Sequence, residues 1–287
     1  MSPELLALVA AFFYSSSNIA ARLGLKHSTP LTVTCTALVV RTVTLWTAVY
    51  LTGGAPPVAS LALFLFVGLG IVQTITSLFS YIGISKVGAS RSQTLRSIYP
   101  LWSVIIAIAI LQEEAGIAVL LGTLSVVAGT ILISWRPEGM SSSYRWWHIL
   151  YPLGAAFLAG IAFPVRRYAL NISNEPLFFA ALLAFVSSAC LGMNLLLGIG
   201  RERLVWDRKA ILPFILAGGF ETLGALLSLI AVSVGQVVVV APIVATSPLW
   251  TLVMSFIVLR DLEKINTRSV MGTISVVAGV IAIIVLR

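Results

Sequence analysis

A few charged side chains stand inside long apolar runs of the sequence. Arg41 is the middle of 36-TALVVRTVTLW-46, in a run that no other charge interrupts from Thr29 to Pro57. Glu221 stands alone in a similar run between Lys209 and Arg260. A guanidinium offers forked donors to a carboxylate or phosphate, and a carboxylate binds an ammonium group or exchanges a proton. An arginine at bilayer depth costs at least about 2.5–3.5 kcal/mol, so such charges need a reason to be there if the runs cross a membrane.

The composition indicates that these runs do cross a membrane. Of the 287 residues, 59% are hydrophobic and only 10% are charged, and the mean hydropathy is +1.05, outside the soluble globular range. Ten stretches are close to the roughly 20 apolar residues that a membrane-spanning helix needs. They do not show the alternation of apolar and polar residues that is typical of the strands of a membrane β-barrel. We therefore expect an all-α membrane protein with ten transmembrane helices, at 4–23, 30–51, 60–84, 92–111, 115–135, 147–169, 176–199, 210–233, 237–259 and 267–286.

The second half of the sequence repeats the first. The segment 98-IYPLWSVIIAIAILQEE-114 matches 246-TSPLWTLVMSFIVLRDL-262 at an offset of 148 residues, and 122-GTLSVVAG-129 matches 272-GTISVVAG-279 at an offset of 150. Residues 1–139 and 140–287 are therefore expected to form two repeats of five helices, and an odd number of spans gives them opposite orientations. Secondary transporters use such inverted repeats to move two halves of a bundle about a central site. The sequence thus predicts alternating access.

Polar residues inside the spans are the candidates for contact with a transported molecule. Arg41 shares a helical face with small residues such as Thr44, whereas bulky residues such as Trp46 lie on the opposite face, which we expect to meet lipid. Arg41 and Arg96 would then bind an anionic group, and Glu221 an ammonium group or a proton. A structural ion pair between Arg41 and Glu221 is the alternative. The predicted substrate-binding residues are Asn18, Arg41, Gln73, Gln93, Arg96, Tyr99 and Glu221.

Matched prolines and tryptophans occur in the fourth and ninth spans. Pro100 and Pro248 each remove a backbone hydrogen bond, and we interpret them as a symmetric pair of kinks suited to gating. Trp102 and Trp250 also match, and core packing is favoured over stacking on a ligand. The basic pair at 166–167 is interpreted as an anchor at the membrane interface.

Several of these features together resemble the EamA-like families of the drug/metabolite transporter superfamily. They are the "SSSNIAARLGL" of the first span, the arginine in the second, "PLW" followed by an acidic hairpin in the fourth and ninth, and "GT(L/I)SVVAG" in the fifth and tenth. The resemblance implies the ten-helix inverted-repeat fold and transport of a small metabolite. Relatives export amino acids, their derivatives and other small metabolites, and distant relatives carry nucleotide sugars or triose phosphates. It also implies that both termini lie in the cytoplasm.

The charges of the loops indicate the opposite orientation. When successive loops are assigned alternately to the two sides of the membrane, thirteen Lys and Arg residues fall on the side opposite the termini. Only Arg166, Arg167 and Arg287 fall on the side of the termini. The positive-inside rule would then place both termini outside. The orientation therefore stays open.

Other classes of protein are not indicated. The sequence has no H-E-x-x-H, G-x-S-x-G or Walker motif, and Cys35 and Cys190 have no metal-ligand spacing. We expect no enzyme, no cofactor, no metal and no nucleic-acid partner. The expected partners are a small-molecule substrate, membrane lipid and protons, and the expected state is a monomer or homodimer in a prokaryotic inner or cell membrane.

The prediction from sequence is a secondary active transporter that exports a small polar or amphiphilic metabolite, such as an amino acid or a derivative. The arginines favour anionic or zwitterionic cargo over cationic drugs. An organic-anion or nucleotide-sugar type antiporter of the same superfamily is the alternative. A channel would share the polar residues inside the spans.

Overall fold

The computed structural model describes residues 1–87, 89–134, 145–196, 204–258 and 267–285, and its regular secondary structure there is entirely helical. Ten helical spans are long and apolar enough to cross a membrane, which confirms the predicted fold class. The elements are α1 (Pro3–Gly24), α2 (Pro30–Leu51), α3 (Ser60–Val87), α4 (Ala89–Arg96), α5 (Tyr99–Leu111), α6 (Ile117–Ser134), η1 (Trp146–Ile149), α7 (Leu150–Ile172), α8 (Pro176–Leu196), α9 (Arg208–Val234), α10 (Val237–Val244), α11 (Ser247–Val258) and α12 (Thr267–Val285).

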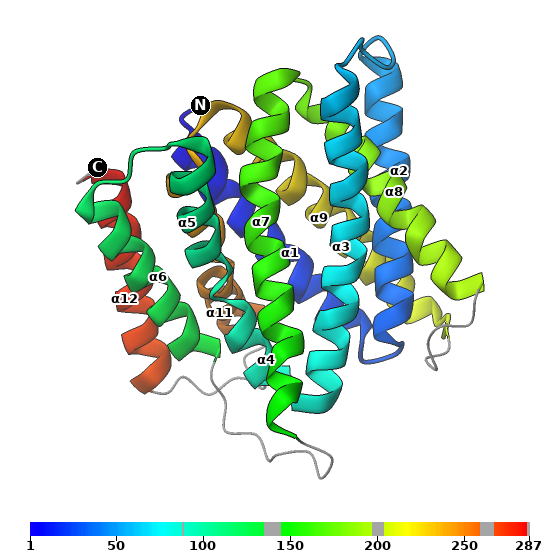
Figure 1. Cartoon of the computed structure of the whole chain (residues 1–287). Coiled ribbons are helices and arrows are strands. Elements are labelled where there is room, and N and C mark those ends of the chain that lie inside the picture. The colour runs from blue at the N-terminus through cyan, green and yellow to red at the C-terminus, as the bar shows by residue number, and fades with distance from the viewer. Residues whose placement is uncertain (88, 135–144, 197–203, 259–266, 286–287) are drawn as a thin grey trace.

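The two halves, α1–α6 and η1–α12, run through the bundle in opposite senses (Figure 1). α1 begins and α12 ends at one end of the bundle, which we call the terminal face. The end at which α1 stops and α2 starts is called the loop face. The predicted boundary between the repeats, at residues 139 and 140, lies outside the described residues.

α6 and α12 lie side by side and pack through the repeated "GT(L/I)SVVAG" segments (Figure 1). A Cβ added at Gly122 would lie 2.8 Å from the Gly279 oxygen, and one added at Gly279 would lie 2.6 Å from the Gly122 oxygen. Ser125 and Ser275 each donate to the carbonyl oxygen of the other, at 2.9 and 2.8 Å. Small residues and serine bonds let the two backbones approach closely, as in other membrane helix pairs.

The fourth and ninth spans are each broken into two helices. One break separates α4 from α5, and the other separates α10 from α11. Pro100 and Pro248 are each the second residue of the new helix, where the missing N–H has no intrahelical partner to lose and the fixed φ favours a helical turn. The prolines therefore start new helices, whereas the sequence had suggested kinks within continuous ones.

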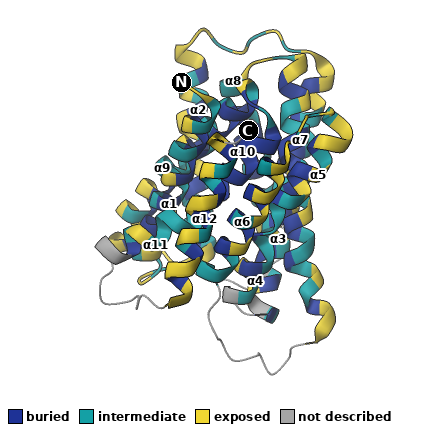
Figure 2. Ribbon diagram, turned by 90° about the vertical axis from the view of Figure 1, so that its left-hand side faces the viewer, coloured by how far each residue is buried: buried dark blue, intermediate teal, exposed yellow. Residues whose placement is uncertain are grey.

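α10 is buried over its whole length. Its residues from Val237 to Val244 are at most 4% exposed, and Figure 2 shows this helix dark blue inside the bundle. Its counterpart in the repeat, α4, instead has an exposed Gln93 and a half-buried Arg96. The two related helices therefore occupy different environments, and this difference shapes the site.

Candidate functional site

A cavity of about 500 Å³ lies between the two halves of the bundle. α1, α2, α3, α4, α8 and α9 all contribute to its wall, mainly through the parts of these helices that are nearer the loop face. Pro248 lines the cavity, whereas Pro100 is buried outside its wall. The structure brings all the predicted substrate-binding residues to this one cavity, namely Asn18, Arg41, Gln73, Gln93, Arg96, Tyr99 and Glu221.

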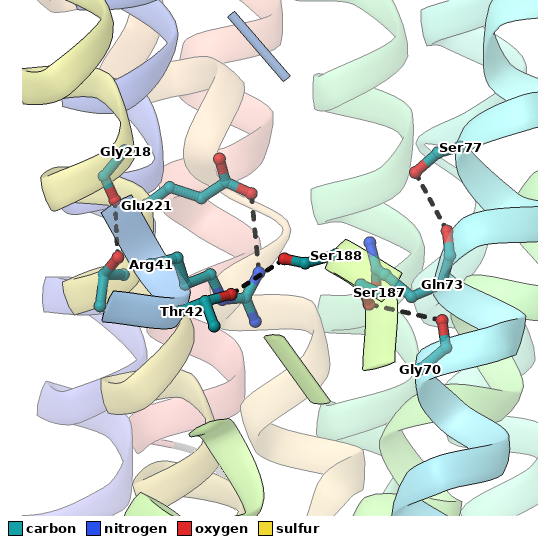
Figure 3. A network of polar contacts seen from close by, with 10 residues as sticks. Arg41, Thr42, Gly70, Gln73, Ser77, Ser187, Ser188, Gly218 and Glu221 are labelled. Carbon is teal, nitrogen blue, oxygen red and sulfur yellow. Dashed lines mark hydrogen bonds and ion pairs between the residues drawn. The ribbon is translucent and has the colours of Figure 1, made fainter. Parts of the chain in front are cut away.

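Arg41 and Glu221 meet on one wall of the cavity (Figure 3). Arg41 Nη1 lies 3.8 Å from Glu221 Oε1, which is an ion pair too long to be a hydrogen bond. The Arg41 side chain is 10% exposed and the Glu221 side chain 40% exposed. Arg41 Nε is buried and has no hydrogen-bond partner in the described part of the chain. The pair therefore balances the two charges but leaves hydrogen-bonding capacity that a ligand can use.

A glycine lets α2 and α9 approach where this pair forms. A Cβ added at Gly218 would lie only 2.9 Å from Ala37 Cα. Thr222, one turn after Gly218, donates its hydroxyl back to the Gly218 oxygen at 2.7 Å and so needs no partner on the facing helix. Arg41 follows Ala37 by one turn and Glu221 follows Gly218 by three residues, so the close approach brings the charges together.

α3 lies across from Arg41, and α8 packs against both α2 and α3 between them (Figure 3). The Gln73 side chain lines the cavity and makes no hydrogen bond to another described residue, whereas its backbone oxygen accepts from Ser77 Oγ at 3.0 Å. Ser187 of α8 donates to the Gly70 oxygen at 3.4 Å and so ties α8 to α3. The Gln73 amide is therefore held on a packed wall with its own donors and acceptor available.

Two tyrosines line the deep end of the cavity. Tyr14 on α1 and Tyr99 on the fourth span are the lining residues of those spans that lie farthest from the loop face. The Tyr99 ring stacks on Phe163 of α7 with the centroids 5.9 Å apart. The Arg166 guanidinium lies over the same Phe163 ring, 5.5 Å from its centroid. One layer of rings thus separates the cavity from a further arginine.

Two sets of side-chain contacts lie at the terminal face, one between the halves and one within the second half. Glu113, which follows α5, accepts hydrogen bonds from the backbone N–H groups of Val237 and Val238, at 3.0 Å each, and so caps the start of α10. Arg167 of α7 donates to the backbone oxygens of Val232 and Ser233 at the end of α9, at 2.9 and 2.7 Å. An acidic and a basic side chain therefore hold the connection between α9 and α10 from both sides. We call these two groups the α9–α10 clamp.

Sequence comparison assigns the family. The profile of the EamA-like transporter family matches residues 1–135 and again residues 146–285, once in each half. The chain belongs to the EamA-like transporter family. No curated protein matches its sequence. A solved structure titled only as the crystal structure of a protein has a TM-score of 0.81 at 14% identity, with 99% of this chain and 96% of that chain covered, and so shares the fold.

Two expectations about side-chain direction do not hold in this EamA-like transporter. Trp46, expected to face lipid, packs edge to face against Phe178 and Phe185 of α8, with centroids 6.1 and 6.2 Å apart. Thr44, expected to face the interior, is exposed. The rest of the predicted wheel holds, since Arg41 is buried and Val39, Val43 and Tyr50 are exposed. Trp46 deviates because α8 covers that edge of α2.

The basic pair at 166–167 is not the interfacial anchor that the sequence suggested. Arg166 is half-buried and its Nε is buried, and Arg167 bonds to the end of α9. α7 continues to Ile172, three residues beyond the predicted span, so both arginines lie farther from the end of the helix than predicted. Tyr168, in contrast, is 48% exposed.

Sequence reasoning missed Tyr14 and Arg166 of this transporter. Tyr14 stands one turn before Asn18 on the same face of α1, so helical periodicity could have found it. Arg166 carried no such signal, because its neighbours Arg167 and Tyr168 are typical of a membrane interface. Only the packing of α7 against α5 shows that Arg166 points inward.

The matched tryptophans lie outside the cavity wall. Trp102 packs edge to face on Phe157 at 5.2 Å, and Trp250 on Phe12 at 5.7 Å. Gly160 allows the contact near Trp102, since a Cβ there would lie 2.4 Å from Trp102 Cβ. Their packing role stays a prediction, and these contacts agree with it.

Proposed function

We propose that this EamA-like chain is a secondary transporter that exports a small polar or amphiphilic metabolite, such as an amino acid or a derivative, by alternating access. The observation that carries the proposal is a cavity between two inverted halves, with a charged pair on its wall and the α9–α10 clamp at one end. The proposed location of the protein is the membrane of a prokaryotic cell. No catalytic step is part of the proposal.

The chemistry of the wall supports a zwitterionic or anionic cargo. Arg41 and Arg96 suit a carboxylate or phosphate, and Glu221 suits an ammonium group or a proton. Exchange of a proton at Glu221 would couple transport to the proton gradient. Transport that keeps its pH response in Glu221→Gln would remove that role.

Two other functions compete with this one. An organic-anion or nucleotide-sugar type antiporter is favoured by the excess of arginine over carboxylate in the cavity wall. A channel is disfavoured because the buried α10 and the clamp at Glu113 stand at the terminal face. Flux that saturates with substrate and shows counterflow in proteoliposomes separates a carrier from a channel.

The test of the proposed site is a thermal-shift screen of purified protein in detergent. The panel contains amino acids, nucleotides, sugar phosphates and cationic drugs, and the variants are Arg41→Ala and the control Thr44→Ala, which changes an exposed residue of the same helix. A ligand that binds the folded state raises its apparent stability in proportion to the logarithm of its concentration over Kd. We expect one chemical class to shift wild type and the control but not Arg41→Ala.

The other outcomes are equally informative. An equal shift in Arg41→Ala would make Arg41 half of a structural pair and move the binding site toward Arg96 and Glu221. Flux that grows linearly with concentration, without saturation, would contradict the carrier and favour a channel.

A further inference from the structure

Arg166 is a cation inside the bundle without a counter-ion. It lies within α7, six residues before the helix ends at Ile172. No carboxylate of the described residues lies within ion-pair distance of it, and its buried Nε has no hydrogen-bond partner among them. The Phe163 ring offers a cation–π contact at 5.5 Å, which compensates only part of the cost of removing a guanidinium from water. A half-buried guanidinium within a transmembrane helix, with its Nε buried and unpaired among the described residues, suits an anionic partner.

The surroundings of Arg166 add positive charge and hydroxyl donors. Arg166 is close enough to Arg41, Tyr14 and Tyr99 to interact with them electrostatically. Tyr14, which lines the cavity, is in turn close enough to both Arg41 and Arg166 to interact with them electrostatically. Glu221 is the carboxylate near this group, and it is already engaged by Arg41. The deep end of the cavity therefore has more positive charge than its own residues balance.

We propose that Arg166, together with the hydroxyls of Tyr14 and Tyr99, forms an anion subsite at the deep end of the cavity, which binds a carboxylate or phosphate group of the transported molecule. The inference rests on the proposed transport function and adds to it the anionic end of the substrate and the residue that holds it. Both tyrosines line the cavity, and the Tyr99 ring and the Arg166 guanidinium both contact the Phe163 ring, so an anion at the tyrosine hydroxyls approaches Arg166 across this ring. Guanidinium and phenol donors are the groups that such an anion needs.

The position of the subsite also suits alternating access. Arg41 and Glu221 lie on the wall of the cavity, whereas Arg166 does not line it and lies over Phe163, the ring on which Tyr99 stacks. An anion held between Arg41 and Arg166 would contact both sides of this ring layer. It would then bind residues of the cavity and residues that lie closer to the terminal face at the same time.

The experiment compares ligands that differ only in the anionic group. The probes are L-leucine with L-leucinamide, and glucose 6-phosphate with glucose, and affinity is taken from concentration-dependent thermal shifts. The variants are Arg166→Gln, which removes the charge, and Arg166→Lys, which keeps it. Since hydrogen bonds to charged groups are among the strong ones, we expect the anionic probe that binds wild type to bind Arg166→Gln at least about tenfold more weakly. Arg166→Lys should bind with an intermediate affinity, and the probe of each pair that lacks the anionic group should lose no affinity in either variant.

Each of the other possible results contradicts a specific part of the proposal. Binding of the anionic probe that is unchanged in Arg166→Gln would overturn the subsite and leave the transporter proposal standing, as would binding of only the probes that lack the anionic group. Binding by no probe would overturn the subsite for carboxylates and phosphates, and counterflow assays would then decide the fate of the transporter proposal separately. If Arg166→Gln does not fold, Tyr14→Phe is used instead, because it keeps the ring and should still weaken anion binding several-fold.

Discussion

The two broken spans, α4–α5 and α10–α11, are related by the repeat but are placed differently. α10 is buried and packs against α5, whereas α4 lines the cavity and makes no comparable contact with α11 among the described residues. In both spans the new helix begins one residue before a proline, so the same sequence feature accompanies the break in the two halves. The two environments therefore differ through tertiary contacts, and one of these is the bond of Glu113 to the start of α10. Asp261, which matches Glu113 in the repeat, lies outside the described residues.

This difference shows where a conformational change would act. Contacts that obey the repeat symmetry, such as those between α6 and α12, can persist when the two halves exchange their arrangements. The contacts of the α9–α10 clamp lie at the terminal face and would have to break for that face to open. Substitutions should therefore separate into those that destabilise the whole fold and those that shift the protein toward an open terminal face.

The largest effect is expected for Glu113→Ala. Removing the carboxylate leaves the Val237 and Val238 N–H groups without their partner at a buried helix start. Two hydrogen bonds to a charged group are worth about 3 kcal/mol together, so the equilibrium should move toward the open terminal face by roughly a hundredfold. The measurement is the rate at which a membrane-impermeant maleimide labels Val238→Cys, in protein that lacks Cys35 and Cys190.

Glu114→Ala is the matched control for this change. Glu114 is the next residue of the same loop and is exposed, and the structure gives it no bond to α10. Its labelling rate should equal that of the parent protein. Equal rates in the two variants would show that Glu113 does not hold the terminal face closed.

The sequence predicted the symmetric parts of the molecule well and the asymmetric parts poorly. Apolar length and the repeated motifs identify ten spans in two inverted halves, and single charges in apolar runs identify Arg41 and Glu221, because these signals are local. The bond between Glu113 and Val237 joins residues that are 124 positions apart, so it depends on how the halves pack. The inward direction of Arg166 likewise depends on α5, which the sequence of α7 does not specify.

An intermediate effect is expected at two glycines that the repeat relates. A Cβ at Gly70 would lie 2.6 Å from Val186 Cβ, and one at Gly218 would lie 2.9 Å from Ala37 Cα. Gly70→Ala and Gly218→Ala should each destabilise the fold by about 1–2 kcal/mol, because the helices must move apart. Both should lower the apparent melting temperature in detergent by similar amounts.

The control for these two substitutions is Gly219, which follows Gly218 on α9. A Cβ at Gly219 would meet no atom within 4 Å, so Gly219→Ala should leave the melting temperature unchanged or raise it, since alanine is the better helix former. A large loss in Gly218→Ala with none in Gly70→Ala would indicate that the two walls of the cavity are not equivalent in packing.

The smallest effect is the coupling between the two groups of the α9–α10 clamp. Glu113 accepts hydrogen bonds from N–H groups at the start of α10, and Arg167 donates to carbonyl oxygens at the end of α9. Both side chains therefore fix the short segment that joins α9 to α10, and each bond helps to keep the other in place. Residues that share a segment in this way couple, and we expect a coupling energy of about 0.5–1 kcal/mol between Glu113→Ala and Arg167→Gln. The labelling rates of Val238→Cys in the parent, the two single variants and the double variant give this energy directly. Strictly additive effects would mean that the two side chains act on separate contacts, and the terminal face would then open in two independent steps rather than one.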